Sequence, residues 1–130
     1  MRKWIWAALA VVALGFASPA QAQIYSSSGA LVANQVVRAA PGKLYSFEVS
    51  QDGAFAAAPW WIMIYDATVA PADGAVTPAK CFAQPPGATS ASYAFNVPIS
   101  FGLGIVIGVS STGCFTKTQS VHAFISGDVQ

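Results

Sequence analysis

Val and Ile dominate the larger aliphatic residues of this chain, and this bias strongly constrains how it can fold. Residues 23–130 contain 18 Val and Ile residues but only three Leu, with one Glu, one Met and one Arg. Leu, Glu, Met and Arg are favoured in helices because they keep their rotamer freedom there. β-Branched and aromatic residues instead fit the half-buried surface of a pleated sheet. The composition therefore predicts an all-β protein.

The expected strands are short, and Pro and Gly residues separate them. They cover residues 31–37, 44–49, 60–65, 79–83, 90–97, 99–101, 104–109 and 121–126. About seven or eight strands with turns at this spacing are typical of a single antiparallel β-sandwich, immunoglobulin-like or jelly-roll-like. We expect residues 23–130 to form this one domain.

Two of these strands have informative patterns. The segment 44–49, LYSFEV, alternates, with Tyr45, Phe47 and Val49 on one face and polar residues on the other. That period of two predicts a half-buried strand. The segment 60–65, WWIMIY, is apolar on both faces, which predicts a central strand covered on both sides.

The N-terminal segment 1–22 has the order of a secretory signal peptide. Arg2 and Lys3 precede an uncharged apolar run, 4–17, and Ala20-Gln21-Ala22 places small residues at the −3 and −1 positions of a cleavage site. The run is shorter than the ~20 residues that a spanning helix needs. We therefore expect cleavage after Ala22 and a periplasmic or secreted product with no transmembrane segment; the alternative is an uncleaved anchor.

The charges of residues 23–130 exclude one class of partner. This part of the chain has four basic and five acidic residues, hence a formal net charge of −1. Nucleic-acid binding requires a clustered basic surface. We therefore expect no nucleic-acid partner.

Two cysteines, Cys81 and Cys114, are the only ones in the chain. An even pair in an exported protein is typical of a structural disulfide. Free thiols are the alternative. A zinc site is not expected, because the chain has a single His and neither cysteine lies in a Cys-x-x-Cys motif.

Catalytic motifs are missing from the sequence. His122 is the only imidazole, and no serine lies in a Gly-x-Ser-x-Gly motif. Nucleophilic catalysis requires a base beside the nucleophile and a group that orients the base. We expect His122 to be a surface or packing residue and the protein not to be an enzyme.

Four residues are possible binding residues. Trp60 and Trp61 are adjacent, so in a strand their indoles point to opposite faces. An outward indole could anchor a partner or stack on a sugar, whereas packing against covered faces is the alternative. Asp66 and Asp73 lie in the loop 66–78 and could share a ligand, although turn formation is the alternative. Calcium favours several acids close in sequence, so we expect no metal and no cofactor.

Three stretches of the sequence, YDATVAPADGAVTP, SFGLGIVIGVSSTGCFTKT and AFISGDV, carry a resemblance. The chain resembles small uncharacterised all-β proteins of alphaproteobacterial phages and prophages. The matching turns are residues 66–78 and 110–118, and the likeness extends loosely over 36–127. The resemblance implies a structural module of a virion or cell surface, and the leader favours a copy sent across the membrane.

These features predict an exported, non-catalytic structural or interaction module. Its expected partner is a protein or another surface, and its few charges favour a homo-oligomer. The alternative is a periplasmic or secreted binding or inhibitor protein that recognises carbohydrate or protein through Trp60 or Trp61 and the loop 66–78.

Overall fold

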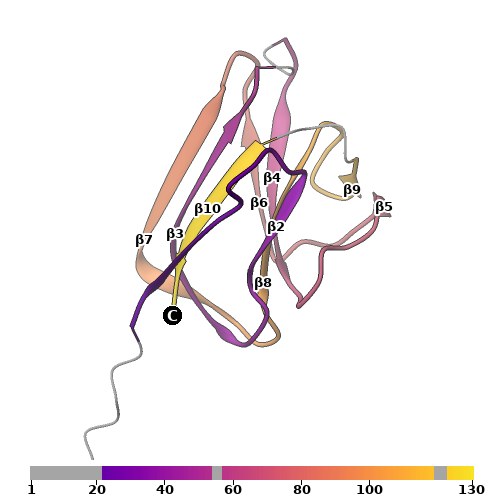
Figure 1. The fold of residues 1–130 in the computed structure, drawn as a ribbon. Coiled ribbons are helices and arrows are strands. Elements are labelled where there is room, and N and C mark those ends of the chain that lie inside the picture. The colour runs from indigo at the N-terminus through magenta and orange to yellow at the C-terminus, as the bar shows by residue number, and fades with distance from the viewer. Residues whose placement is uncertain (1–21, 54–56, 119–122) are drawn as a thin grey trace, which may run out of the picture.

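The computed structural model describes residues 22–53, 57–118 and 123–130, and in these residues all regular structure is β (Figure 1). The strands are β1 (Ile24–Ser27), β2 (Asn34–Arg38), β3 (Gly42–Gln51), β4 (Trp60–Asp66), β5 (Gly74–Ala75), β6 (Lys80–Gln84), β7 (Ser90–Phe101), β8 (Ile105–Ser110), β9 (Thr116–Lys117) and β10 (Ala123–Val129). No helix in this part of the chain is long and apolar enough to cross a membrane.

The strands form two four-stranded antiparallel sheets and a small ribbon. Sheet A has the order β1-β10-β3-β7, sheet B has the order β2-β8-β4-β6, and β5 pairs with β9. Figure 1 shows β7, β3 and β10 on one side, β2, β4 and β8 on the other, and the ribbon beyond sheet B. The predicted antiparallel β-sandwich is confirmed.

The main core lies between the two sheets. Phe47 and Val49 of β3 face Ile62 and Ile64 of β4, and all four side chains are buried. Phe47 also stacks on Tyr93, with ring centroids 5.0 Å apart. This core explains why the inward positions of the strands are β-branched or aromatic, since such residues bury large apolar areas on a pleated surface.

The apolar stretch in β4 is a central strand, as its sequence predicts. β4 lies between β8 and β6, and its residues face two cores. Ile62 and Ile64 join the main core, whereas Met63 and Tyr65 pack with Val106 on the opposite face of sheet B. Both faces of β4 are therefore covered, which explains why apolar and polar residues do not alternate along this strand.

A register shift between β3 and β7 corrects one expectation. Ala94 of β7 pairs with Ser46, but the next pair is Ile99 with Leu44, so β7 bulges between them. The predicted strands 90–97 and 99–101 are consequently one strand, because Pro98 lies in the bulge of an edge strand, where its missing N–H is tolerated.

A second register shift, between β3 and β10, changes which residues of β3 face the core. Tyr45 was expected on the face of Phe47 and Val49, but Leu44 is the buried residue there. Tyr45 is half-buried, and its hydroxyl donates to the side chain of Gln130. Asp128 of β10 pairs with Ser46 and Val129 with Leu44, so Tyr45 is an extra residue of β3 that has no partner on β10, and the alternation shifts by one residue there.

Three strands were not expected from the sequence: β1, β5 and β9. All three are short, and β5 and β9 lie within the two loops that the sequence predicted as turns. The predicted strand 121–126 corresponds to β10, which runs from Ala123 to Val129. Residues 121 and 122 lie outside the described residues.

Candidate functional site

The loops at residues 66–78 and 110–118 come together in space. Gly74 pairs with Lys117 and Ala75 with Thr116, and the amide of Val76 donates to the carbonyl of Phe115 at 3.0 Å. We call residues 66–78 and 110–118 together the lobe. Its residues Ala67, Ala70 and Val76 pack on the cluster of Met63, Tyr65 and Val106. The lobe therefore covers part of the outer face of sheet B.

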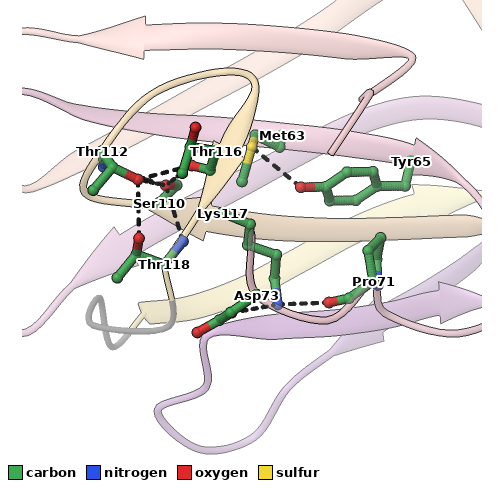
Figure 2. A network of polar contacts seen from close by, with 9 residues as sticks. All are labelled: Met63, Tyr65, Pro71, Asp73, Ser110, Thr112, Thr116, Lys117 and Thr118. Atoms are coloured by element: carbon green, nitrogen blue, oxygen red, sulfur yellow. Dashed lines mark hydrogen bonds and ion pairs between the residues drawn. The ribbon is translucent and has the colours of Figure 1, made fainter. Parts of the chain in front are cut away.

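A buried lysine holds the lobe together (Figure 2). The side chain of Lys117 is 0% exposed, and its Nζ donates to the carbonyl of Pro71 at 2.7 Å. The same Nζ forms an ion pair with Asp73 Oδ1 at 3.2 Å. A buried ammonium group requires such partners, because desolvation without them is costly. The structure thus gives Asp73 a structural partner within the lobe.

In the segment 110–118 of the lobe, Ser and Thr hydroxyl groups form a network of hydrogen bonds (Figure 2). The carbonyl of Thr116 accepts hydrogen bonds from Ser110 Oγ and Thr112 Oγ1, both at 2.8 Å. Thr112 Oγ1 also lies 3.0 Å from Thr118 Oγ1, and the amide of Thr118 donates to Ser110 Oγ. These hydroxyls bond to one another and to the backbone, which makes the segment 110–118 a self-supporting loop.

Tyr65 lies beside this network, with its side chain almost fully buried. Its hydroxyl donates to Met63 Sδ at 3.1 Å. Burial, and then the negative charge of Asp73, raises the pKa of Tyr65 to about 12. The phenol is therefore neutral at physiological pH and belongs to the packing beneath the lobe.

Asp66 has a different structural role, at the turn between β7 and β8. Its carboxylate accepts the backbone N–H groups of Gly102, Leu103 and Gly104 at 3.0, 2.7 and 3.3 Å. The hydrogen bonds from Leu103 and then Gly102 hold the pKa of Asp66 below its ordinary value. The structure does not bring Asp66 and Asp73 to one ligand site; each has protein partners of its own.

The predicted cysteine pair forms a disulfide. Cys81 of β6 and Cys114 of the lobe are bonded, with Cα atoms 5.8 Å apart, a usual separation for such a bond. The bridge attaches the lobe to the edge of sheet B. It also fits an oxidising, non-cytoplasmic environment.

The two tryptophans have different surroundings. Trp60 is fully buried in the main core, and its Nε1 donates to the carbonyl of Ala88 at 2.8 Å. Trp61 is half-buried, with Ser110 and Ala83 as its neighbours on the adjacent strands. Of the two, only Trp61 therefore presents part of its side chain to solvent.

The described residues contain no candidate metal site. His122 lies outside the described residues. Within the described ranges, no group of three or more His, Cys, Asp or Glu side chains could hold a metal ion.

The outer face of sheet A is a surface of a different kind, which we call the serine face. Outward residues that pair across adjacent strands form three rows on this face. The rows are Phe124, Ser50 and Ser90; Ser27, Ser126, Glu48 and Ser92; and Tyr25, Asp128, Ser46 and Ala94. The side chains that alternate with them on β10 and β3, such as Ile125 and Val49, point into the core.

The serine face combines aromatic, hydroxyl and carboxylate groups. Tyr25 is 67% exposed and Phe124 48% exposed. Two shallow hollows of about 120 and 160 Å³ share Tyr25, Glu48 and Ser126 as lining residues. The three rows contain two carboxylates, Glu48 and Asp128, and no Lys, Arg or His. Such a surface offers ring faces and hydrogen-bonding groups to a partner.

Sequence reasoning missed this surface although part of its signal was present. Alternate positions 46, 48 and 50, 90 and 92, and 126 and 128 are polar in strands whose other positions are apolar. The pairing of β1 with β10 adds Tyr25 and Ser27, and β1 was not expected. Without that strand, the second aromatic group of the face could not be placed.

Comparison of the chain with family models, curated proteins and solved structures finds no match.

Proposed function

We propose that this protein is an exported, non-catalytic interaction module that docks a partner on its serine face. The observation that carries the proposal is the contrast between the two outer faces. The lobe covers Met63, Tyr65 and Val106 on sheet B, whereas Tyr25 and Phe124 stand exposed on sheet A. Exposed aromatic side chains on an otherwise polar sheet are typical of recognition surfaces.

Export is supported by two independent features. The segment 1–22 has the charged, apolar and small-residue order of a cleaved leader. The disulfide between Cys81 and Cys114 is of a kind that persists in oxidising compartments. A periplasmic or secreted location follows from the two together.

The absence of catalysis is also part of the proposal. Glu48 and Asp128 lie on an open sheet rather than in an enclosed cleft that would exclude water. The serine hydroxyls of the three rows have no imidazole or amine base in those rows. This chemistry suits hydrogen bonding to a partner better than bond cleavage.

The phage resemblance supports a surface location for the module. Both matching loops, 66–78 and 110–118, lie in the lobe, where they hold the fold together. The lobe thus leaves the serine face open, and a partner on a virion-like or cell surface could dock there.

Homo-oligomerisation is a further part of the proposal, through a surface other than the serine face. The edge strand β7 has twelve residues and no charge, and its Val97 is 80% exposed. Uncharged edge strands readily pair with another strand. Sedimentation of the purified protein at micromolar concentrations tests this point; a monomer throughout would contradict it.

Site-specific photo-crosslinking tests the docking surface. A photoreactive phenylalanine analogue replaces Tyr25 or Phe124 on the serine face, or Phe115 on the lobe as a matched exposed aromatic. Irradiation of cells that export the protein should give the same discrete adduct from both positions on the serine face and no such adduct from position 115. Equal adducts from all three positions, or none from the serine face, would contradict the proposal.

A further inference from the structure

Two carboxylates occupy the middle of the serine face. Glu48 pairs laterally with Ser126, and Asp128 lies two residues along β10 from Ser126. Glu48 and Asp128 are therefore diagonal neighbours on adjacent strands, a relationship that places such residues about 7–8 Å apart. Their spacing is fixed by the pairing of two strands whose other faces are buried in the core.

Among the residues that the structure describes, neither carboxylate has a cationic partner. Within residues 22–53, 57–118 and 123–130, neither Glu48 nor Asp128 forms an ion pair; Asp128 accepts a hydrogen bond from Ser46 Oγ at 2.7 Å. Lys43 lies in the next row along: its backbone pairs with that of Gln130, two residues from Asp128, and its side chain forms no ion pair with a described residue. The three rows therefore carry two negative charges that no ion pair with a described residue neutralises, and Lys43 borders them beyond Asp128.

Aromatic rings flank these two charges. Tyr25 is the lateral neighbour of Asp128, and Phe124 precedes Ser126 by two residues on the same strand. Guanidinium groups stack on aromatic faces and bind carboxylates in a bidentate manner. The juxtaposition of exposed rings with carboxylates that form no ion pair with a described residue thus favours cationic side chains, above all Arg.

The spacing also indicates the shape of the partner. In an extended chain, alternate side chains point the same way and lie about 7 Å apart. This repeat matches the separation of about 7–8 Å expected between Glu48 and Asp128. We propose that the serine face binds an extended protein segment that carries two cationic side chains at alternate positions, as in Arg-x-Arg.

Other occupants fit these observations less well. A second copy docked by the same face would bring Glu48 and Asp128 close to their own counterparts, and like charges oppose such pairing. A neutral glycan would stack on the rings but would leave the charges without complement. The inference rests on the proposed function, since it names the chemistry of the partner that docks there.

Peptide binding to the exported, disulfide-bonded protein tests the inference. The probes are fluorescent synthetic peptides in which Arg alternates with Ser, and peptides of identical composition in which the Arg residues are clustered in adjacent pairs. The variants are Glu48→Gln and Asp128→Asn, which each remove one negative charge from the face. Asp52→Asn is the matched control, because it removes the same charge from an exposed acid outside the three rows.

We expect the alternating peptide to bind more tightly than the clustered one and to lose affinity with added NaCl. Each of the two face variants should weaken binding about fivefold to tenfold, whereas Asp52→Asn should leave it unchanged. Equal binding of both peptides, an equal effect of Asp52→Asn, or no binding overturns the inference. Salt-independent binding of maltohexaose instead would assign the face to neutral glycans.

The two proposals can fail separately. Photo-crosslinks at positions 25 and 124 without binding of the alternating peptide would leave the docking face standing and remove the cationic partner. Peptide binding without crosslinks at either position in cells would show a basic-segment affinity that the exported protein does not use, and would contradict the proposed function.

Discussion

Lys117 Nζ lies 3.2 Å from Asp73 Oδ1, with the lysine side chain fully buried and the aspartate 47% exposed. The pair joins residues from the two loops of the lobe, and Pro71 supplies the second acceptor for Nζ. An ammonium group in such a position depends on both acceptors. This geometry explains how two loops without long strands keep a defined shape.

Asp73→Asn should destabilise the protein by about 1–2 kcal/mol, because it leaves the buried ammonium group with a weaker partner on a half-exposed side chain. Lys117→Met keeps the apolar stem and removes the charge, so Asp73→Asn should cost much less in that background. Urea unfolding of the two single variants and the double variant measures this coupling. Equal losses in both backgrounds would show that the ion pair does not stabilise the lobe.

The disulfide should be a large contributor to stability. Replacing Cys81 and Cys114 by Ser should lower the free energy of unfolding by about 3–4 kcal/mol, since the bond closes a long loop in the unfolded chain. The measurement is chemical denaturation of the double variant beside the oxidised protein. Uptake of an alkylating agent by the unreduced, denatured wild type would contradict the bond itself.

The carboxylate of Asp66 should make the stability of the folded protein fall at acidic pH. Its pKa is lower in the folded protein because Leu103, Gly102 and Gly104 donate to its carboxylate. The ionised carboxylate of Asp66 therefore stabilises the folded protein fully above the ordinary carboxyl pKa of about 3.9. This stabilisation is lost as the pH falls through the lower pKa of the folded state. Asp66→Ala should lower the melting temperature at neutral pH and flatten its fall in acid, as calorimetry across this range would measure. An unchanged acid profile would contradict the role of this turn.

The buried phenol of Tyr65 should make the stability of the folded protein fall at alkaline pH. Its pKa of about 12 in the folded protein exceeds the ordinary value of 10.0. The neutral phenol of Tyr65 therefore contributes fully to the stability of the folded protein below pH 10, and this contribution is lost as the pH rises through about 12. Absorbance titration should show a late-titrating phase that Tyr65→Phe removes. A wild-type curve that Tyr65→Phe leaves unchanged would contradict the buried phenol.

The architecture was predictable from the sequence because local patterns carry it. The period of two in 44–49, the two-sided apolar stretch 60–65 and the even cysteine pair each led to a feature that the structure contains. These signals depend on neighbouring residues or on composition, so a single sequence suffices to detect them.

The missing parts depend on pairing between distant segments. Tyr45 leaves the core face because it is an extra residue of β3 opposite β10, and nothing near Tyr45 in sequence shows this. Asp73 is fixed by Lys117, and the serine face requires β1 to lie beside β10 although almost the whole chain separates them. Single-sequence periodicity does not report such registers.

The central claim is that a partner covers the serine face of the exported protein, and hydroxyl-radical footprinting in cells measures this directly. Tyr25, Phe124 and Phe115 are 67%, 48% and 70% exposed, so radicals should oxidise all three in the purified protein. In exporting cells, oxidation of Tyr25 and Phe124 should fall while that of Phe115 stays unchanged. Equal oxidation of Tyr25 and Phe124 in cells and in the purified protein would contradict the claim.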